Sequence, residues 1–246
     1  MFYCISFYDG DLEILNHIEN DDFIIYAKGK TEVPGSERLA NYGYNLSSYF
    51  TFIIDNYDDL PKRIGFLKNN VFPRHVTKDT FIRSLLKSDD FVGIEEPKTY
   101  SHKQGVSYFD SKDGFFEINN SWYLTSKRTK YFYSFNHFMN SVFTNYNKRA
   151  YVNFVPGANF ILDRDLIRKF PKNFYYNLNL FMKHNEYANE SHLIERAMKI
   201  IFTEDLKIND IFKSKLSEGA LNSMGFRTFL LRKMLLVKPL NKFFLL

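Results

Sequence analysis

The chain has 246 residues, of which 45% are hydrophobic, so it encodes a folded protein with a sizeable core and not a disordered polypeptide. Its single cysteine, Cys4, excludes an internal disulfide and suits a reducing, cytoplasmic compartment. The sequence shows no secretory signal and no apolar run long enough to span a bilayer, so neither is expected.

The formal net charge of +5 is concentrated near the C-terminus. Residues 221–246 contain no acid and carry the basic residues Arg227, Arg232, Lys233, Lys238 and Lys242. The remainder is formally neutral, which argues against a nucleic-acid protein with a broad basic face. Residues 226–246 are also strongly apolar, which suits the surface of an anionic membrane at its inner, cytoplasmic face. The alternative is a helix docked on the body or in a homo-oligomer.

The first third of the chain alternates between apolar runs and helical periodicity. Strands are expected over residues 2–8, 23–26 and 63–67, with a short helix at roughly 11–19 and a long one over 44–57. Pro61 lies just beyond that long helix, where a helix cannot continue. The alternation predicts an α/β fold whose mostly parallel sheet is flanked by helices.

The remaining elements are read with the same patterns. A helix is expected over 77–88 and a strand over 91–94, whereas residues 95–130 lack periodicity and are interpreted as an irregular functional loop. Helices are predicted over 135–143, 164–169, from Pro171 onward and over 190–202, with a strand pair or one bent strand over 151–162. We expect one domain over 1–205 and a basic, amphipathic, helical segment over 206–246.

Two stretches carry a more specific pattern. The first contains Asn41, Gly43, Ile53, Ile54, Asn56, Tyr57, Leu60, Pro61, Phe66 and His75. The second contains Gly157, Ala158, Phe160, Arg164, Pro171, Tyr175, Glu195, Ile201 and Phe202. By these residues the chain resembles, over 1–205, the domain of unknown function 3431 family, which occurs in fungi and bacteria. That family usually has Arg-Glu after the first glycine and Gln-Gly after the following strand, whereas this chain has Tyr44-Asn45 and Lys68-Asn69.

The family is itself similar to GT-A-type glycosyltransferases, which have a single nucleotide-binding α/β domain. The resemblance implies a GT-A-like transferase that moves a sugar from a nucleotide-sugar donor to a glycan or lipid-linked glycan acceptor in cell-surface polysaccharide biosynthesis. The alternative is a non-catalytic carbohydrate-binding or scaffold subunit of a glycan-assembly complex. Residues 95–130 and 155–195 would frame the acceptor.

The loop from Lys68 to His75 follows a central strand, at the sheet edge where open α/β sheets bind ligands. Lys68, Asn69, Asn70 and His75 are therefore candidate donor-binding residues, because cations and amides bind diphosphate and sugar hydroxyls. The alternative is a solvated polar loop. The loop has no acidic pair for a metal ion, so the sequence leaves open whether Mn²⁺, Mg²⁺ or no cofactor is used.

Further candidates for the donor site come from three other segments. Asp9 and Asp11 have an Asp-x-Asp spacing after the first strand, although a turn is the simpler explanation. Asn41 is included through the resemblance. Gly157 would allow close approach of the backbone to a ligand, with Asn159 and Arg164 facing it.

Glu195 is the candidate catalytic base, because an inverting glycosyl transfer needs a carboxylate to accept the acceptor's hydroxyl proton. A surface ion pair between Glu195 and Lys199, four residues apart on one helix, is the alternative. Asp163, which precedes a predicted helix, is interpreted as its N-cap and not as part of the site.

Overall fold

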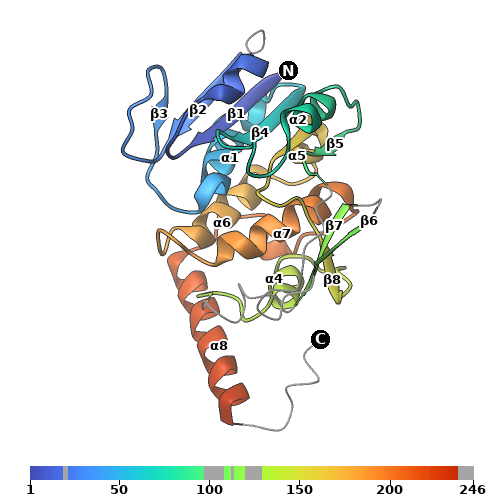
Figure 1. Cartoon of the computed structure of the whole chain (residues 1–246). Helices are drawn as coiled ribbons and strands as arrows, with labels where there is room; N and C mark the ends of the chain where they lie inside the picture. The colour runs from blue at the N-terminus through green and yellow to red at the C-terminus, as the bar shows by residue number, and fades with distance from the viewer. Residues whose placement is uncertain (19–21, 97–107, 112–113, 120–128, 238–246) are drawn as a thin grey trace.

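The structure, a computed structural model of the chain, describes residues 1–18, 22–96, 108–111, 114–119 and 129–237 (Figure 1). Its main element is a six-stranded sheet with the order β3-β2-β1-β4-β9-β5. The strands are β1 (Phe2–Phe7), β2 (Asp22–Ala27), β3 (Glu37–Arg38), β4 (Arg63–Lys68), β5 (Phe91–Gly93) and β9 (Phe160–Asp163). Strands β1 to β4 pair in parallel, and β9 runs antiparallel to both β4 and β5. The predicted α/β class with a mostly parallel sheet is confirmed.

Each face of this sheet has its own core, because successive side chains in a strand point to opposite faces. In β1, Cys4 packs on the side of helix α1 (Tyr44–Asp55), whereas Tyr3 and Ile5 pack on the other side. That second face is covered by the 3₁₀ helix η1 (Glu13–His17) and helix α2 (Lys78–Leu85). Helix α1 ends before Pro61, as predicted, and is followed by the short 3₁₀ helix η2 (Tyr57–Asp59).

The α1 side of the sheet carries the larger core. Helices α6 (Lys172–Met182) and α7 (Glu190–Thr203) form a layer below the sheet in Figure 1, and α4 (Phe135–Val142) packs beneath α7. The short helix α5 (Arg164–Arg168) follows β9, and η3 (Asp210–Phe212) leads to the long C-terminal helix α8 (Glu218–Val237). The chain thus forms one mixed α/β domain, in which Phe212 is buried in the main core.

Several predicted elements need correction. Residues 95–130 are not irregular throughout, because β6 (Tyr108–Ser111) and β7 (Gly114–Ile118) form a hairpin that pairs with β8 (Tyr151–Asn153). The strand pair expected over 151–162 is real, but β8 and β9 belong to different sheets. Residues 11–19 give only the 3₁₀ helix η1. The other parts of the proposed acceptor frame, 97–107, 112–113 and 120–128, lie outside the described residues.

Asp163 precedes α5 as predicted, but its side chain does not cap the helix. Its Oδ1 instead accepts a hydrogen bond from Arg63 Nη1 at 2.6 Å, because Arg63 and Asp163 are paired residues on neighbouring strands. Asp163 therefore occupies the N-cap position of α5, as predicted, but its side chain joins β4 to β9 instead of capping the helix. Within the described part of the chain, no helix has both the length and the apolar character needed to cross a bilayer.

Candidate functional site

A cavity of about 200 Å³ opens at the carboxyl end of β4, between the first turn of α1 and the N-terminal half of α7. Its lining residues come from segments that are far apart in the sequence: Tyr44, Asn45, Leu46, Lys68, Arg74, His75, Gly157, Ser191, His192 and Glu195. Because it combines cationic, aromatic and acidic side chains in a concave space, it is the best candidate for a ligand site.

Lys68 reaches the cavity as the last residue of β4. Ile64 and Phe66 face the α1 core, so the strand's two-residue period directs Lys68 to the same side, just beyond that core. Its Nζ makes no hydrogen bond and no ion pair with any residue that the structure describes. Burial lowers the pKa of Lys68, while the charge of Glu195 acts against that shift. An incoming anion would supply the missing partner.

The turn at Gly157 forms the floor of the cavity. Gly157 and Ala158 have positive φ angles of 85° and 50°, a conformation that glycine adopts at little cost. A Cβ atom at Gly157 would lie 2.6 Å from Cε1 of His75, so only glycine leaves room for the imidazole ring. The Gly157 carbonyl accepts a hydrogen bond from Asn45 Nδ2 at 3.1 Å, and its N–H donates to Glu195 Oε1 at 2.8 Å.

Glu195 stands at the centre of a charged cluster on α7. Its Oε2 lies 3.1 Å from Nη1 of Arg196 and 3.7 Å from Nδ1 of His192. Burial would raise the pKa of Glu195, but the His192 contact and the charges of Arg196 and Lys68 outweigh it and hold the pKa well below its usual range. The group is therefore a stable carboxylate. The alternative pair with Lys199 is not formed between these described residues, since Glu195 is bonded to Gly157 and Arg196 instead.

Arg196 connects this cluster to the second sheet. Its Nε donates to Glu117 Oε2 on β7 at 2.6 Å, and its guanidinium lies 4.6 Å from the ring centroid of Phe154. Glu117 and Arg196 are both buried. The buried pair of Arg196 and Glu117 thus fixes the orientation of Glu195 from behind, while the Glu195 side chain still lines the cavity.

Lys28 shapes the opposite wall. It directly follows β2, on the side of the sheet that faces α1, and its side chain is 6% exposed. Its Nζ donates hydrogen bonds to the carbonyls of Tyr42 and Tyr44 and to Ser47 Oγ. With all its protons used in this way, Lys28 holds the first turn of α1 against the sheet. Tyr44, which has a φ of 49°, is presented at the cavity mouth as a result.

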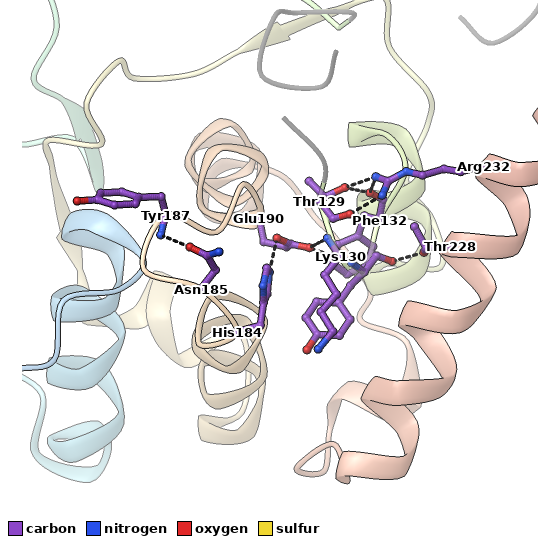
Figure 2. Close-up of polar contacts among 10 residues, drawn as sticks. Thr129, Lys130, Phe132, His184, Asn185, Tyr187, Glu190, Thr228 and Arg232 are labelled. Carbon is purple, nitrogen blue, oxygen red and sulfur yellow. Dashed lines mark hydrogen bonds and ion pairs between the residues drawn. The ribbon is translucent and has the colours of Figure 1, made fainter. Parts of the chain in front are cut away.

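Aromatic rings line that mouth. The Tyr44 ring lies 5.3 Å from His192 and 6.1 Å from Tyr187, measured between centroids. Tyr187 is 51% exposed, and its N–H is held by Asn185 Oδ1 at 2.9 Å in the loop between α6 and α7, as Figure 2 shows. The rim therefore offers flat apolar surfaces next to the charged interior.

Four residues predicted for the site lie together at the cavity: Lys68, His75, Gly157 and Glu195. Asn69 and Asn159, also predicted, are structural instead. Asn69 is buried and its Nδ2 donates to the carbonyls of Asp9 and Asp11, so it joins the loops after β1 and β4. Asn159 is fully buried and its Oδ1 accepts from the backbone N–H of Lys68 at 2.9 Å.

The prediction that Arg164 faces the same ligand is wrong. Strand β9 runs antiparallel to β4, so the last residue of β9, Asp163, pairs with the first residue of β4, Arg63. Arg164 therefore lies at the end of β4 that is opposite to Lys68. There its Nη1 donates to the carbonyl of Leu60.

The other predicted donor-binding residues do not line the cavity. Asp9 and Asp11 are exposed and bind backbone N–H groups of their own loop, as expected for a turn. Asn70 is exposed in the turn after β4, and Asn41 donates to Glu186 on the loop before α7. These four residues surround the site without entering it.

Sequence reasoning missed several cavity residues: Tyr44, Asn45, Ser191 and His192 as lining groups, and Lys28 as their support. Arg74 also lines the cavity and belongs to the loop already proposed for the donor. One signal was present, because Tyr44, Asn45 and Lys68 are three of the positions at which the chain departs from its family's usual residues. Lys28 gave a similar signal, because it directly follows the apolar strand β2, and Lys68 is the last residue of the apolar strand β4. Among the described residues, no cluster of His, Cys, Asp and Glu is arranged to hold a metal ion.

Comparison with known proteins bears on the family alone. Neither the curated proteins nor the solved structures give a significant match. A family model matches residues 12–213, which is well over half of the chain and includes every residue that lines the cavity. The chain therefore belongs to the family described as protein of unknown function (DUF3431).

Proposed function

We propose that this protein is a GT-A-like glycosyltransferase, which transfers a sugar from a nucleotide-sugar donor to a glycan acceptor in cell-surface polysaccharide biosynthesis. The observation that carries the proposal is the cavity itself, where Lys68 and His75 from one half of the chain meet Gly157 and Glu195 from the other half. Its position at the carboxyl end of β4 is the edge at which open α/β sheets bind ligands.

The strand order supports a nucleotide ligand. The strand order β3-β2-β1-β4 matches the first four strands of dinucleotide-binding sheets, and the chain reverses its direction of travel across the sheet between β1 and β4. Ligands of such sheets lie at that switch point. Tyr8 directly follows β1 at this switch point, and its side chain is 53% exposed. Strand β1 pairs with β4, so Tyr8 lies near the end of β4, where Lys68 is located.

The size of the cavity limits which part of the donor enters it. Pockets that enclose a whole drug-sized ligand measure about 300–1,000 Å³, and this cavity has about 200 Å³. We assign it to the diphosphate and the sugar, with the nucleoside along the sheet edge near Tyr8. Lys68 and Arg74 would neutralise the leaving diphosphate, and Tyr44 and Tyr187 would stack on sugar or base.

The departures from the family pattern bear on substrate choice. Tyr44, Asn45 and Lys68 occupy positions where Arg, Glu and Gln are usual, and all three line the cavity. Lys68 adds a cation where the family pattern has a neutral amide. We infer that this chain binds a more anionic donor, or binds it more tightly, than relatives that keep the usual residues.

Proton transfer is assigned to the pair of Glu195 and His192. A base works best when its pKa lies near the working pH, and the low pKa of Glu195 makes its carboxylate a weak proton acceptor. His192 lies 3.7 Å from it and also lines the cavity, so the carboxylate can orient the imidazole. Glu195 as the direct base remains the competing assignment.

The first test is a screen of nucleoside diphosphate sugars for binding and hydrolysis, with and without Mn²⁺ or Mg²⁺. We expect binding of at least one donor, about tenfold or more weaker in Lys68→Met because a charge-assisted contact to phosphate is lost. Lys87→Met, which removes an exposed lysine just after α2 that does not line the cavity, is the matched control and should bind normally.

Two variants then separate the roles in proton transfer. If His192 is the base, His192→Asn should lower kcat about 100-fold or more, with Glu195→Gln lowering it less and shifting the pH profile. If Glu195 is the base, the order is reversed. Near-full activity of both variants would remove the pair from the chemistry, and donor binding without any turnover would favour the non-catalytic carbohydrate-binding subunit.

A further inference from the structure

Beyond its first two turns, helix α8 directs its polar contacts inward and exposes large apolar side chains, whereas the apolar residues near its start pack on the main core. Thr228 is fully buried and donates from Oγ1 to the carbonyl of Tyr131 at 2.6 Å. Arg232 donates to the carbonyl of Thr129 at 2.6 Å and to that of Phe132 at 3.1 Å. Figure 2 shows both residues pointing from α8 toward this segment before α4. A surface helix normally has the reverse arrangement.

The segment that receives α8 is itself fixed from the other side. Oε1 of Glu190, at the start of α7, accepts hydrogen bonds from the N–H groups of Lys130 at 2.5 Å and Tyr131 at 2.8 Å. Glu190 is fully buried, and its Oε2 lies 2.8 Å from Nε2 of His184 (Figure 2). The attachment of α8 is therefore a defined polar joint, and the orientation of the helix determines which of its faces meets solvent.

The outer face of α8 is unusually apolar. Five large side chains on it are exposed: Phe226 by 62%, Phe229 by 53%, Leu230 by 42%, Leu231 by 36% and Met234 by 64%. Positions 226, 230 and 234 recur at intervals of four residues, so they share one side of the helix. We call these five residues the outer face of α8. Exposed apolar groups clustered in this way mark a surface that is covered by something else.

The charges on the same helix indicate what kind of surface covers the outer face of α8. Arg227 and Lys233 are exposed beside the apolar groups, and residues 219–246 contain no acid at all. The sequence of 238–246 adds Lys238 and Lys242 among further apolar residues. A second copy packed by two-fold symmetry would bring these cations against their own counterparts, which is unfavourable. An anionic lipid surface instead matches both the charge and the apolar groups.

We propose that the outer face of α8 docks on an anionic membrane, with Phe226 and Met234 entering the interface between headgroups and acyl chains and Arg227 and Lys233 contacting lipid phosphates. The helix lies along the surface and does not cross it. This inference is independent of the proposed transferase activity, because it uses no residue of the cavity.

The test is sedimentation of the whole protein with vesicles of phosphatidylcholine alone, or of phosphatidylcholine with about 30% phosphatidylserine. We expect at least tenfold stronger partitioning to the anionic vesicles, decreasing as salt is raised because surface charges are screened. No sugar donor is present, so the outcome does not depend on the proposed activity.

Two sets of variants make the test specific. The double variant Phe226→Gln/Met234→Gln should bind anionic vesicles at least tenfold more weakly, and Arg227→Gln/Lys233→Gln should lose the preference for anionic lipid. Leu86→Gln removes a leucine that is 81% exposed on another part of the surface, and it should bind like the wild type. All these side chains are exposed, so unchanged melting temperatures will verify that the variants fold.

Three results would overturn the proposal. The first is wild-type protein that stays in the supernatant with both vesicle types. The second is Phe226→Gln/Met234→Gln that binds as well as the wild type. The third is a wild-type dimer in analytical ultracentrifugation that this double variant abolishes, since the outer face would then be covered by a second copy.

Discussion

At the scale of single residues, the candidate site depends on a turn that only one amino acid fits. Gly157 uses a positive φ of 85°, contacts the His75 ring and binds Glu195 through its N–H. One residue thereby sets the distance between the loop after β4 and helix α7. The geometry of the cavity is consequently sensitive to a change of a single methyl group at this position.

Gly157→Ala should lower the free energy of unfolding by about 1–3 kcal/mol, because a side chain is strained at this φ and its Cβ would displace His75. The measurement is urea unfolding followed by circular dichroism. Gly219→Ala is the control, because only Ser217 lies within 4 Å of the new Cβ atom. In a helix, alanine is more favourable than glycine by up to about 1 kcal/mol, so this variant should not be destabilised. Equal effects of the two substitutions would contradict the tight contact described here.

At the scale of elements, α7 connects the site with the C-terminal helix. Its N-terminal half presents His192 and Glu195 to the cavity, and its first residue, Glu190, holds the segment on which α8 rests. An acid in the first turn is favourable because the N-terminus of a helix carries a partial positive charge. The same helix thus organises both of the surfaces for which we propose a function.

Glu190→Gln tests this connection. The amide keeps one acceptor for the N–H groups of Lys130 and Tyr131 but loses the charge beside His184, so we expect a loss of about 1–3 kcal/mol in unfolding free energy. Hydrogen exchange of α8 amides should accelerate in the variant, as its support loosens. Glu218→Gln, at the exposed start of α8, should leave both quantities nearly unchanged. Unaltered exchange in α8 of Glu190→Gln would refute the joint.

At the scale of the whole molecule, the buried amine of Lys28 makes global stability depend on pH. Burial lowers the pKa of Lys28 from 10.5 to about 7. Between these values the unfolded chain binds a proton that the folded chain lacks, so the free energy of unfolding rises with pH by at most about 1.4 kcal/mol per unit from this group. Below about pH 7 both states are protonated and the contribution is constant.

Lys28→Met removes this titration along with the three hydrogen bonds of the amine. The stability gap, the unfolding free energy of the wild type minus that of the variant, should rise with pH between about pH 7 and pH 9, because only the wild type carries the buried amine. Urea unfolding of both proteins across that range measures the gap, and other titrating groups cancel in the difference. A gap that is constant with pH would show that Lys28 keeps its proton in the folded protein.

Local sequence patterns were sufficient to predict many of the helices and strands in their correct order. Local periodicity specified α1, α2, α4 and α7, and the apolar runs specified β1, β2, β4 and β5, because both signals depend only on neighbouring residues. The same signals identified the segments that carry Lys68, His75, Gly157 and Glu195. Lys68 in particular could be predicted at a sheet edge, since it ends an apolar strand.

Which of these residues lie together depends on contacts between distant parts of the chain. The antiparallel direction of β9 separates Arg164 from Lys68, and no local pattern encodes strand direction. The hairpin β6–β7 depends on pairing with the distant β8, so its residues appeared irregular. Likewise, the apolar side chains of α8 point outward because Thr228 and Arg232 find backbone carbonyls on the body. Long-range pairing, and not composition, determines which side of an element faces solvent.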